Sequence, residues 1–177
     1  DTFEKTSTAI KTRGFWLGTN LITALIAASV INIFKETLEQ VIFLAVLMPI
    51  IASMGGVAAT QTLTITVRGL ALGQIVRANY LYIFNRELMV GISNGFIWAV
   101  ILSLIACSWF QDWLLAWVIC LSMIINLVAG VLSGMGIPIL LKSLKMDPAV
   151  AGSVIVTTVT DVIGFFSFLG LASYFYS

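Results

Sequence analysis

The sequence contains no histidine, only two cysteines and very little charge. Charged residues make up 10% of its 177 residues, whereas a soluble domain carries about 25%. The absence of histidine excludes Ser-His-Asp hydrolysis, histidine zinc sites and histidine proton relays. Hydrophobic residues make up 60% of the chain, and no basic cluster suggests nucleic acid. The composition therefore predicts an integral membrane protein.

Other catalytic arrangements are also missing. An intramembrane aspartyl protease needs two carboxylates at membrane depth, but Asp112 and Asp147 lie at the ends of apolar runs. No glycine-rich phosphate loop follows a strand. Cys107 and Cys120 both lie within apolar runs, where free buried thiols are more common than a disulfide. We therefore expect a protein that is not an enzyme.

Five apolar runs are each long enough to cross a hydrocarbon core of about 30 Å as a helix. We expect an all-α integral membrane fold with five transmembrane helices, preceded by a polar lead-in at residues 1–13, with the membrane domain at 14–177. The chain begins with Asp rather than Met, which favours a piece of a longer protein. The expected spans are residues 14–34, 41–67, 88–110, 114–138 and 149–176.

Lysine and arginine are distributed unevenly between the two sides of the membrane. In a chain with five spans, three segments lie on one side of the membrane. The lead-in has three lysine or arginine residues, the connector at 68–87 has three, and the loop before the last span has two. The opposite side has only Lys35. Because positive residues accumulate on the cytosolic side, we expect a cytosolic N-terminus and an outward C-terminus.

The second span contains residues that are unusual in a membrane helix. Pro49 and the pair Gly55-Gly56 interrupt the apolar run, and Thr60 follows them. One interpretation is a kinked helix that packs closely through its glycines. The other is a broken helix that lines a water-filled path. Small residues four apart, which favour close helix packing, also occur at Gly69 and Gly73, Gly91 and Gly95, and Gly130 and Gly134.

Asp161 is the only charged residue of the last span. A helix places it roughly 18 Å from the start of that span, near the middle of the membrane. A carboxylate there costs at least about 2.5 kcal/mol, so it is a functional candidate. Thr157 lies one turn before it and Thr158 three residues before it, so hydroxyls share this region of the helix.

One carboxylate among neutral oxygens suits a hard cation such as Mg²⁺ or Ca²⁺. A two-fold dimer would bring two copies of Asp161 together and supply two negative charges. Two alternatives remain open on chemistry alone: a proton relay through Asp161, and a structural polar contact. Asp147 precedes Pro148 and has a sufficient role as the N-cap of the last helix, with metal binding as the alternative.

Two long motifs resemble the transmembrane domain of the MgtE family of magnesium channels. The stretch MPIIASMGGVAATQTLTITVRGLALG at 48–73 resembles the second span of that family. The stretches LLKSLKMDPA at 140–149 and TTVTDVIG at 157–164 resemble its fifth span. The resemblance implies a homodimer whose pore lies on the two-fold axis, between the second and fifth spans.

The resemblance also assigns roles to individual residues. Asp161 matches the pore acid, and oxygens at Thr157 and Ser153 help to hold hydrated Mg²⁺. Asp147 matches an acid at the cytosolic mouth that takes part in closure. The implied pore lining consists of Gly55, Gly56, Val57, Thr60, Val154 and Thr158. The family has Asn where Val57, Thr60 and Ser153 stand, so a divalent-cation pathway is a firmer expectation than strict selectivity for Mg²⁺.

The resulting prediction is a Mg²⁺ channel domain in a prokaryotic cell membrane, with Ca²⁺ and Mn²⁺ as other candidate ions. Its expected partners are a second copy of itself, membrane lipid and the cytosolic regulatory domains of a longer parent chain. One alternative is a Na⁺- or H⁺-coupled carrier that uses the same Asp161. Another is a membrane subunit that transports nothing.

Overall fold

The computed structural model describes residues 6–176, apart from the side chain of Val150, and these residues form helices and their connections. Each of the five long helices is apolar and long enough to cross a membrane, which confirms the predicted number of spans. They are α1 (Thr6–Ile33), α3 (Phe43–Ala71), α4 (Tyr80–Phe110), α5 (Trp113–Ser143) and α6 (Val150–Tyr176). The connections contain a short helix, α2 (Lys35–Gln40), and a 3₁₀ turn, η1 (Arg77–Asn79).

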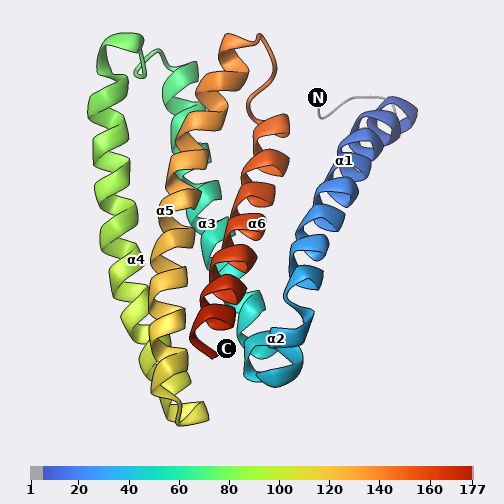
Figure 1. Cartoon of the computed structure of the whole chain (residues 1–177). Helices are drawn as coiled ribbons and strands as arrows, with labels where there is room; N and C mark the ends of the chain where they lie inside the picture. Colours follow the sequence, from blue (N-terminus) through green and yellow to red (C-terminus); the bar gives the residue numbers. More distant parts are fainter. Residues whose placement is uncertain (1–5, 177) are drawn as a thin grey trace.

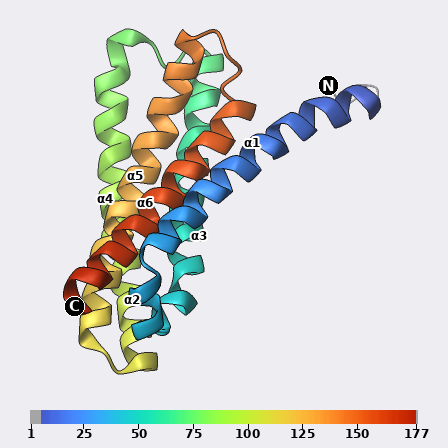
Figure 2. The same cartoon turned by 45° about the vertical axis from the view of Figure 1, so that its right-hand side comes forward.

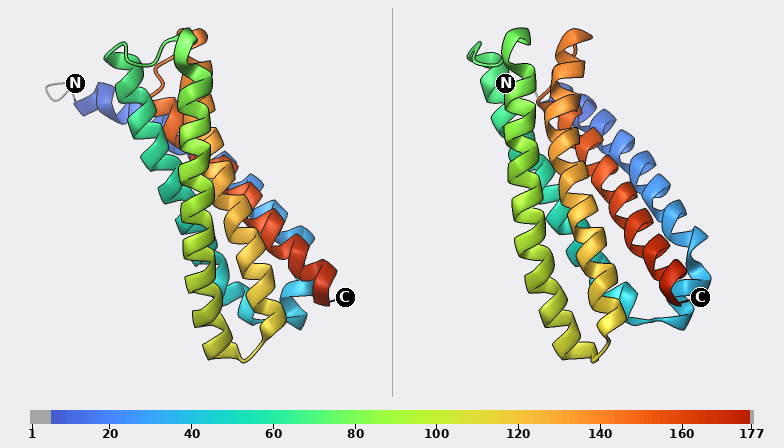
Figure 3. Two further views of the ribbon diagram at one scale, coloured as in Figure 1. Left: turned by 90° about the vertical axis from the view of Figure 1, so that its left-hand side faces the viewer. Right: turned by 60° about the vertical axis from the view of Figure 1, so that its left-hand side comes forward.

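Helix α5 is the centre of the bundle. It packs against α3, α4 and α6, while α1 lies beside α6 (Figure 1). Helix α1 leans away from the bundle toward its N-terminal end (Figure 2), and Ala27 is its one buried residue. The start of α1 and the end of α6 lie at opposite ends of the bundle in every view (Figure 3), as an odd number of spans requires.

Several helices extend beyond the apolar runs that predicted them. Helix α4 begins at Tyr80, so residues 80–87, expected in a connector, are helical. Helix α5 continues to Ser143 and α1 begins at Thr6, whereas spans ending at 138 and beginning at 14 were expected. Residues 1–5 of the lead-in lie outside the described residues. Hydropathy detects the part of a helix within hydrocarbon, whereas helical hydrogen bonding continues into the polar interface.

Helix α3 is continuous across Pro49, Gly55 and Gly56. Of the two interpretations of the second span, the broken helix is therefore wrong. Proline removes the N–H that would bond to the carbonyl of Ala45, but this affects one hydrogen bond near the start of the helix. A longer break would leave further backbone groups without partners in hydrocarbon, which is costly.

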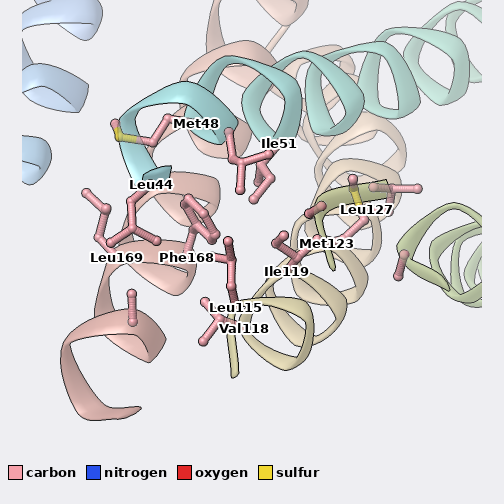
Figure 4. Close-up of a cluster of buried hydrophobic side chains, with 14 residues drawn as sticks. Leu44, Met48, Ile51, Leu115, Val118, Ile119, Met123, Leu127, Phe168 and Leu169 are labelled. Carbon is pink, nitrogen blue, oxygen red and sulfur yellow. The ribbon is translucent and has the colours of Figure 1, made fainter. Parts of the chain in front are cut away.

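The main hydrophobic core lies between the first half of α3, the first half of α5 and the end of α6. Figure 4 shows Leu44 and Ile51 of α3 and Phe168 of α6 pointing toward Leu115 and Ile119 of α5. All five residues are 0% exposed. This core holds the C-terminal half of α6 against α3 and α5.

Glycines bring the backbones of α3 and α5 into close approach. A Cβ atom added to Gly134 would lie 2.5 Å from the carbonyl oxygen of Ala59, and one added to Gly130 would lie 2.8 Å from that of Gly55. On the other side of α5, a Cβ at Gly91 of α4 would lie 2.8 Å from Val131. Close packing at these positions agrees with the prediction from their spacing.

The pair Gly69 and Gly73 behaves differently, and its prediction as a helix-packing pair is wrong. A Cβ on Gly69 would meet Ile75 at 2.7 Å, within the same turn of chain. Gly73 has a φ of 68°, a conformation that favours glycine, and it ends the turn after α3. The two glycines therefore shape a local turn.

Asp112 joins the ends of α5 and α6. Its carboxylate caps α5 by accepting hydrogen bonds from the N–H groups of Leu114 at 2.8 Å and Leu115 at 3.2 Å. The hydroxyl of Tyr176, at the end of α6, donates to the other carboxylate oxygen. Because one side chain holds both helices, the C-terminal end of α6 is tied to the start of α5.

Candidate functional site: a polar groove beside Asp161

A groove of about 560 Å³ runs along one face of α3 and reaches Thr157 of α6. Polar side chains follow one another along α3 at helical spacing, so that they project from the same side. All of them are exposed in the single chain. The residues of α3 that line the groove are Ser53, Gly56, Val57, Thr60, Gln61, Thr64, Ile65 and Arg68.

The threonines of this region present their oxygens as acceptors. The hydroxyl of Thr60 donates to the carbonyl of Gly56 at 2.8 Å, and that of Thr64 to the carbonyl of Thr60 at 2.8 Å. On α6, Thr157 donates to the carbonyl of Ser153 at 2.9 Å. A hydroxyl whose proton is bound in its own helix keeps lone pairs for another partner. These oxygens are suited to a cation or to its bound water.

Asp161 lies one turn after Thr157 on α6, which places the two side chains on one face of the helix. Asp161 is half-buried, and no cationic side chain within residues 6–176 pairs with it. In that same part of the chain, no three carboxylate, thiol or imidazole groups gather into a metal cluster. One chain therefore brings a single carboxylate to this region.

The structure brings some of the expected site residues together and leaves others apart. Gly56, Val57, Thr60 and Thr157 meet in the groove. Gly55 is buried on the side of α3 that faces α5, where an added Cβ would clash with the side-chain amide of Asn126. The other expected residues of α6 are outside the groove lining: Asp161, Val154 and Thr158, which are half-buried, and Ser153, which is exposed.

Asp147 lies in the exposed connection before α6, away from the groove lining. Its carboxylate accepts a hydrogen bond of 2.9 Å from the N–H of Ala149. That bond is of the kind made by an N-cap, although α6 itself begins at Val150. The carboxylate keeps a second oxygen for another ligand.

Sequence reasoning missed five residues of the groove: Ser53, Gln61, Thr64, Ile65 and Arg68. Their signal was present in the sequence, because steps of three and four residues from Ser53 reach Val57, Thr60, Thr64 and Arg68 in turn. Asn126, a polar residue within the fourth span, is fully buried at the junction of α3, α5 and α6. There its Nδ2 donates to the carbonyl of Ile51 at 2.8 Å.

Comparison with known proteins agrees with this architecture. The family model MgtE, described as a divalent cation transporter, matches residues 48–171. A protein of Bacillus subtilis named magnesium transporter MgtE is 33% identical over 90% of this chain. Proteins of the same name from Enterococcus faecalis and Thermus thermophilus are each 29% identical, over 90% and 89% of this chain.

The chain spans about a third of the length of these relatives, with 36%, 35% and 35% of each covered. The match extends over the four helices that form the groove and the core, from within α3 to within α6. The predicted family is thereby confirmed. The chain belongs to the MgtE family of divalent cation transporters.

Proposed function

We propose that this membrane domain conducts Mg²⁺ through a pore formed between two copies of the chain, along the groove of α3 and α6. The observation that carries the proposal is the row of exposed polar residues on α3, from Ser53 through Thr60 to Thr64. Polar side chains on a membrane-spanning helix face a bundle interior or a water-filled cavity rather than lipid. In a single chain none of the other described helices covers this polar side of α3. In the proposed dimer a second copy of the chain covers it.

A two-fold axis along the groove would also bring a second carboxylate to the ion, which one chain alone lacks. Each chain contributes one Asp161, and two copies contribute two carboxylates to an ion with two positive charges. Mg²⁺ keeps several of its waters and needs few direct protein ligands. In this proposal Asp161 attracts the ion, while oxygens of Thr157 and Ser153 contact the ion or its water.

Selectivity is expected to be broader than for Mg²⁺ alone. Val57 is 53% exposed and lines the groove beside Thr60. A valine at this position offers no oxygen or amide to order the waters of a hydrated ion. We expect Ca²⁺ and Mn²⁺ to pass through the same path more readily than in a pore lined by amides.

The membrane potential is sufficient to drive the ion inward. Each elementary charge gains about 2.3 kcal/mol per 100 mV, so a divalent ion gains roughly 4.6 kcal/mol. That free energy corresponds to a ratio of more than a thousandfold between the Mg²⁺ concentrations inside and outside at equilibrium. A channel therefore needs no opposing ion gradient, which separates it from a coupled carrier.

The proposed orientation places the N-terminus in the cytosol. The termini lie at opposite ends of the bundle (Figure 1), and the arginine-containing α3–α4 connection lies at the end where α6 begins. Asp147 then lies at the cytosolic mouth, where it could take part in closure. Because the relatives are about three times longer than this chain, we propose that cytosolic regulatory domains accompany it in the parent protein.

The test is uptake of Mg²⁺ into proteoliposomes without a Na⁺ or pH gradient, comparing the original chain with Asp161→Asn. The substitution keeps the volume of the side chain and removes its charge. We expect uptake to fall at least tenfold in the variant while a sizing column shows the same dimer. Equal uptake would remove Asp161 from the mechanism, and uptake that appears only after a gradient is imposed would favour the carrier.

A further inference from the structure

Asn126 lies near the middle of α5, with its side chain between the backbones of α3 and α6, and it is 0% exposed. A Cβ atom added to Gly55 of α3 would clash with its side-chain amide. One added to Gly164 of α6 would lie 2.7 Å from its Nδ2 atom. The amide therefore fits because neither neighbouring helix has a side chain at that point. We call Gly55, Asn126 and Gly164 the amide junction.

The two glycines of the amide junction belong to the helices that form the groove. Gly55 directly precedes Gly56, which lines the groove, and Gly164 follows Asp161 by three residues. Three residues of a helix correspond to about 4.5 Å along its axis, so the junction lies less than one turn from the level of Asp161. The contact at Asn126 therefore sets the separation of α3 and α6 close to this acid.

Two other contacts between α3 and α6 lie farther from Asp161. Val156 of α6 forms a small buried cluster with Ala59 of α3, five residues before Asp161. Phe168 belongs to the main core together with Leu44 of α3, seven residues after Asp161. Of these three contacts, the amide junction is the nearest to the acid.

The polar atoms of Asn126 also act on the rotation of α3. Nδ2 donates to the carbonyl of Ile51 at 2.8 Å, and Oδ1 has no hydrogen-bond partner within residues 6–176. A buried acceptor without a donor is unfavourable, so stability alone does not account for an amide at this position. The bond to Ile51 holds α3 in the rotation that directs Gly55 toward α5 and Gly56, about 100° farther round the helix, toward the groove.

We propose that Asn126 is a positioning residue for cation selectivity, whose amide sets the separation of α3 and α6 beside Asp161 and thereby the width of the ion path. The inference rests on the proposed function, because that path is the groove along these two helices. Mg²⁺ gives up its waters reluctantly and demands near-ideal geometry, whereas Ca²⁺ accepts longer and more flexible coordination. A narrower path therefore hinders hydrated Mg²⁺ more than Ca²⁺, and a wider path has the opposite effect.

Two substitutions at the junction change this separation in opposite directions. Asn126→Ala removes the amide, so α3 and α6 approach each other, and we expect the ratio of Ca²⁺ to Mg²⁺ uptake into proteoliposomes to rise about fivefold or more. Gly164→Ala adds a Cβ that presses on the amide, so the helices separate and the ratio falls about threefold or more. In the double variant the new Cβ fills part of the vacated space, and the ratio returns to within about twofold of the original.

Ser122→Ala is the matched control. Ser122 is also 0% exposed and lies one turn before Asn126, but its hydroxyl bonds within α5, to the carbonyl of Ile119 at 3.1 Å. We expect this variant to keep the original ratio. Because both ions are measured on one preparation, a lower amount of folded protein does not change the ratio.

The inference is overturned if Asn126→Ala and Gly164→Ala both keep the original ratio or both shift it in the same direction. Where Asn126→Ala yields no folded protein, a lower ratio in Gly164→Ala supports the inference and an unchanged ratio overturns it. Asp161→Asn separates this failure from a failure of the proposed function. If it lowers Mg²⁺ uptake while the junction variants keep the ratio, only the role of Asn126 is wrong. If it leaves uptake unchanged, the pore along the groove is wrong and the role of Asn126 with it.

Discussion

The two sides of α3 differ in what covers them. One side of α3 packs against α5 with backbone atoms in contact, at Gly55, Ala59 and Leu63. On the other side Ser53, Thr60 and Thr64 are exposed. In a soluble protein the exposed side would simply meet water. In the function proposed above, the exposed side lines the pore, whereas the close packing of the buried side stabilises the pair of helices.

The largest expected effect comes from filling the contact between α3 and α5. In Gly134→Ala the new Cβ would lie 2.5 Å from the carbonyl oxygen of Ala59 and 3.1 Å from the N–H nitrogen of Leu63. Both are backbone atoms, so the helices must separate, at a cost of about 3 kcal/mol. Thermal unfolding of the purified chain in detergent measures this loss.

Gly56→Ala is the matched control for that substitution. A Cβ at Gly56 meets nothing within 4 Å, since this residue faces the groove. We expect unchanged unfolding and reduced Mg²⁺ uptake. If both alanine variants were equally unstable, the contrast between the two sides of α3 would be wrong.

Asn126→Ala is expected to have the next largest effect on stability. It removes the hydrogen bond of 2.8 Å to the carbonyl of Ile51 and leaves a cavity among three helices. We expect a loss of about 1–2 kcal/mol, since hydrogen bonds between membrane helices contribute about 0.6 kcal/mol on average and a small cavity adds to it. Ser122→Ala is the comparison, because its hydroxyl is equally buried but bonds within its own helix, to Ile119. A similar loss in both variants would contradict a special role for the junction.

Two threonine substitutions on opposite sides of α3 should separate transport from stability. Thr60→Val removes an oxygen from the groove, and we expect Mg²⁺ uptake to fall severalfold with less than about 0.5 kcal/mol of lost stability. Thr66→Val changes a residue that is 1% exposed and bonded within α3, so uptake should be unchanged. Equal uptake in the two variants would argue against a pore along the groove.

The smallest effect is expected at Arg68. Its side chain lines the groove in the last turn of α3, where its charge favours the helix C-terminus and repels a cation. We expect Arg68→Gln to raise Mg²⁺ uptake about twofold at low ionic strength and much less at 1 M salt, where the Debye length is about 3 Å. Uptake that does not depend on salt in either protein would rule out this electrostatic role.

Hydropathy alone predicted the five spans, because each hydrocarbon crossing requires a long apolar run. It did not predict where the helices end. Glu87 was assigned to a connector because it follows Arg86 and Asn85, but these residues belong to the first turns of α4. A polar helix that projects beyond hydrocarbon looks like a loop in a hydropathy profile.

The candidate site was predictable in part. Asp161 stood out because a lone carboxylate is rare in an apolar run, and Gly56, Val57 and Thr60 meet in the groove with Thr157. The separate positions of Gly55 and Gly56 were not predictable. Neighbouring residues on a helix point about 100° apart, and only the position of α5 decides which of the two glycines is buried.

The tie between Tyr176 and Asp112 has a geometric consequence for the acid of the last span. Helix α6 is held at that end by the tie and by the core around Phe168, whereas its first turns follow an exposed connection. Along the helix axis, Asp161 lies about 22 Å and Val150 about 39 Å from Tyr176. If α6 tilts about its tied end, Asp161 moves a little over half as far as the start of the helix. A displacement of the connection beside Asp147 would therefore move the carboxylate of Asp161 in the same direction by a little over half that distance, because α6 moves as a rigid body about Tyr176.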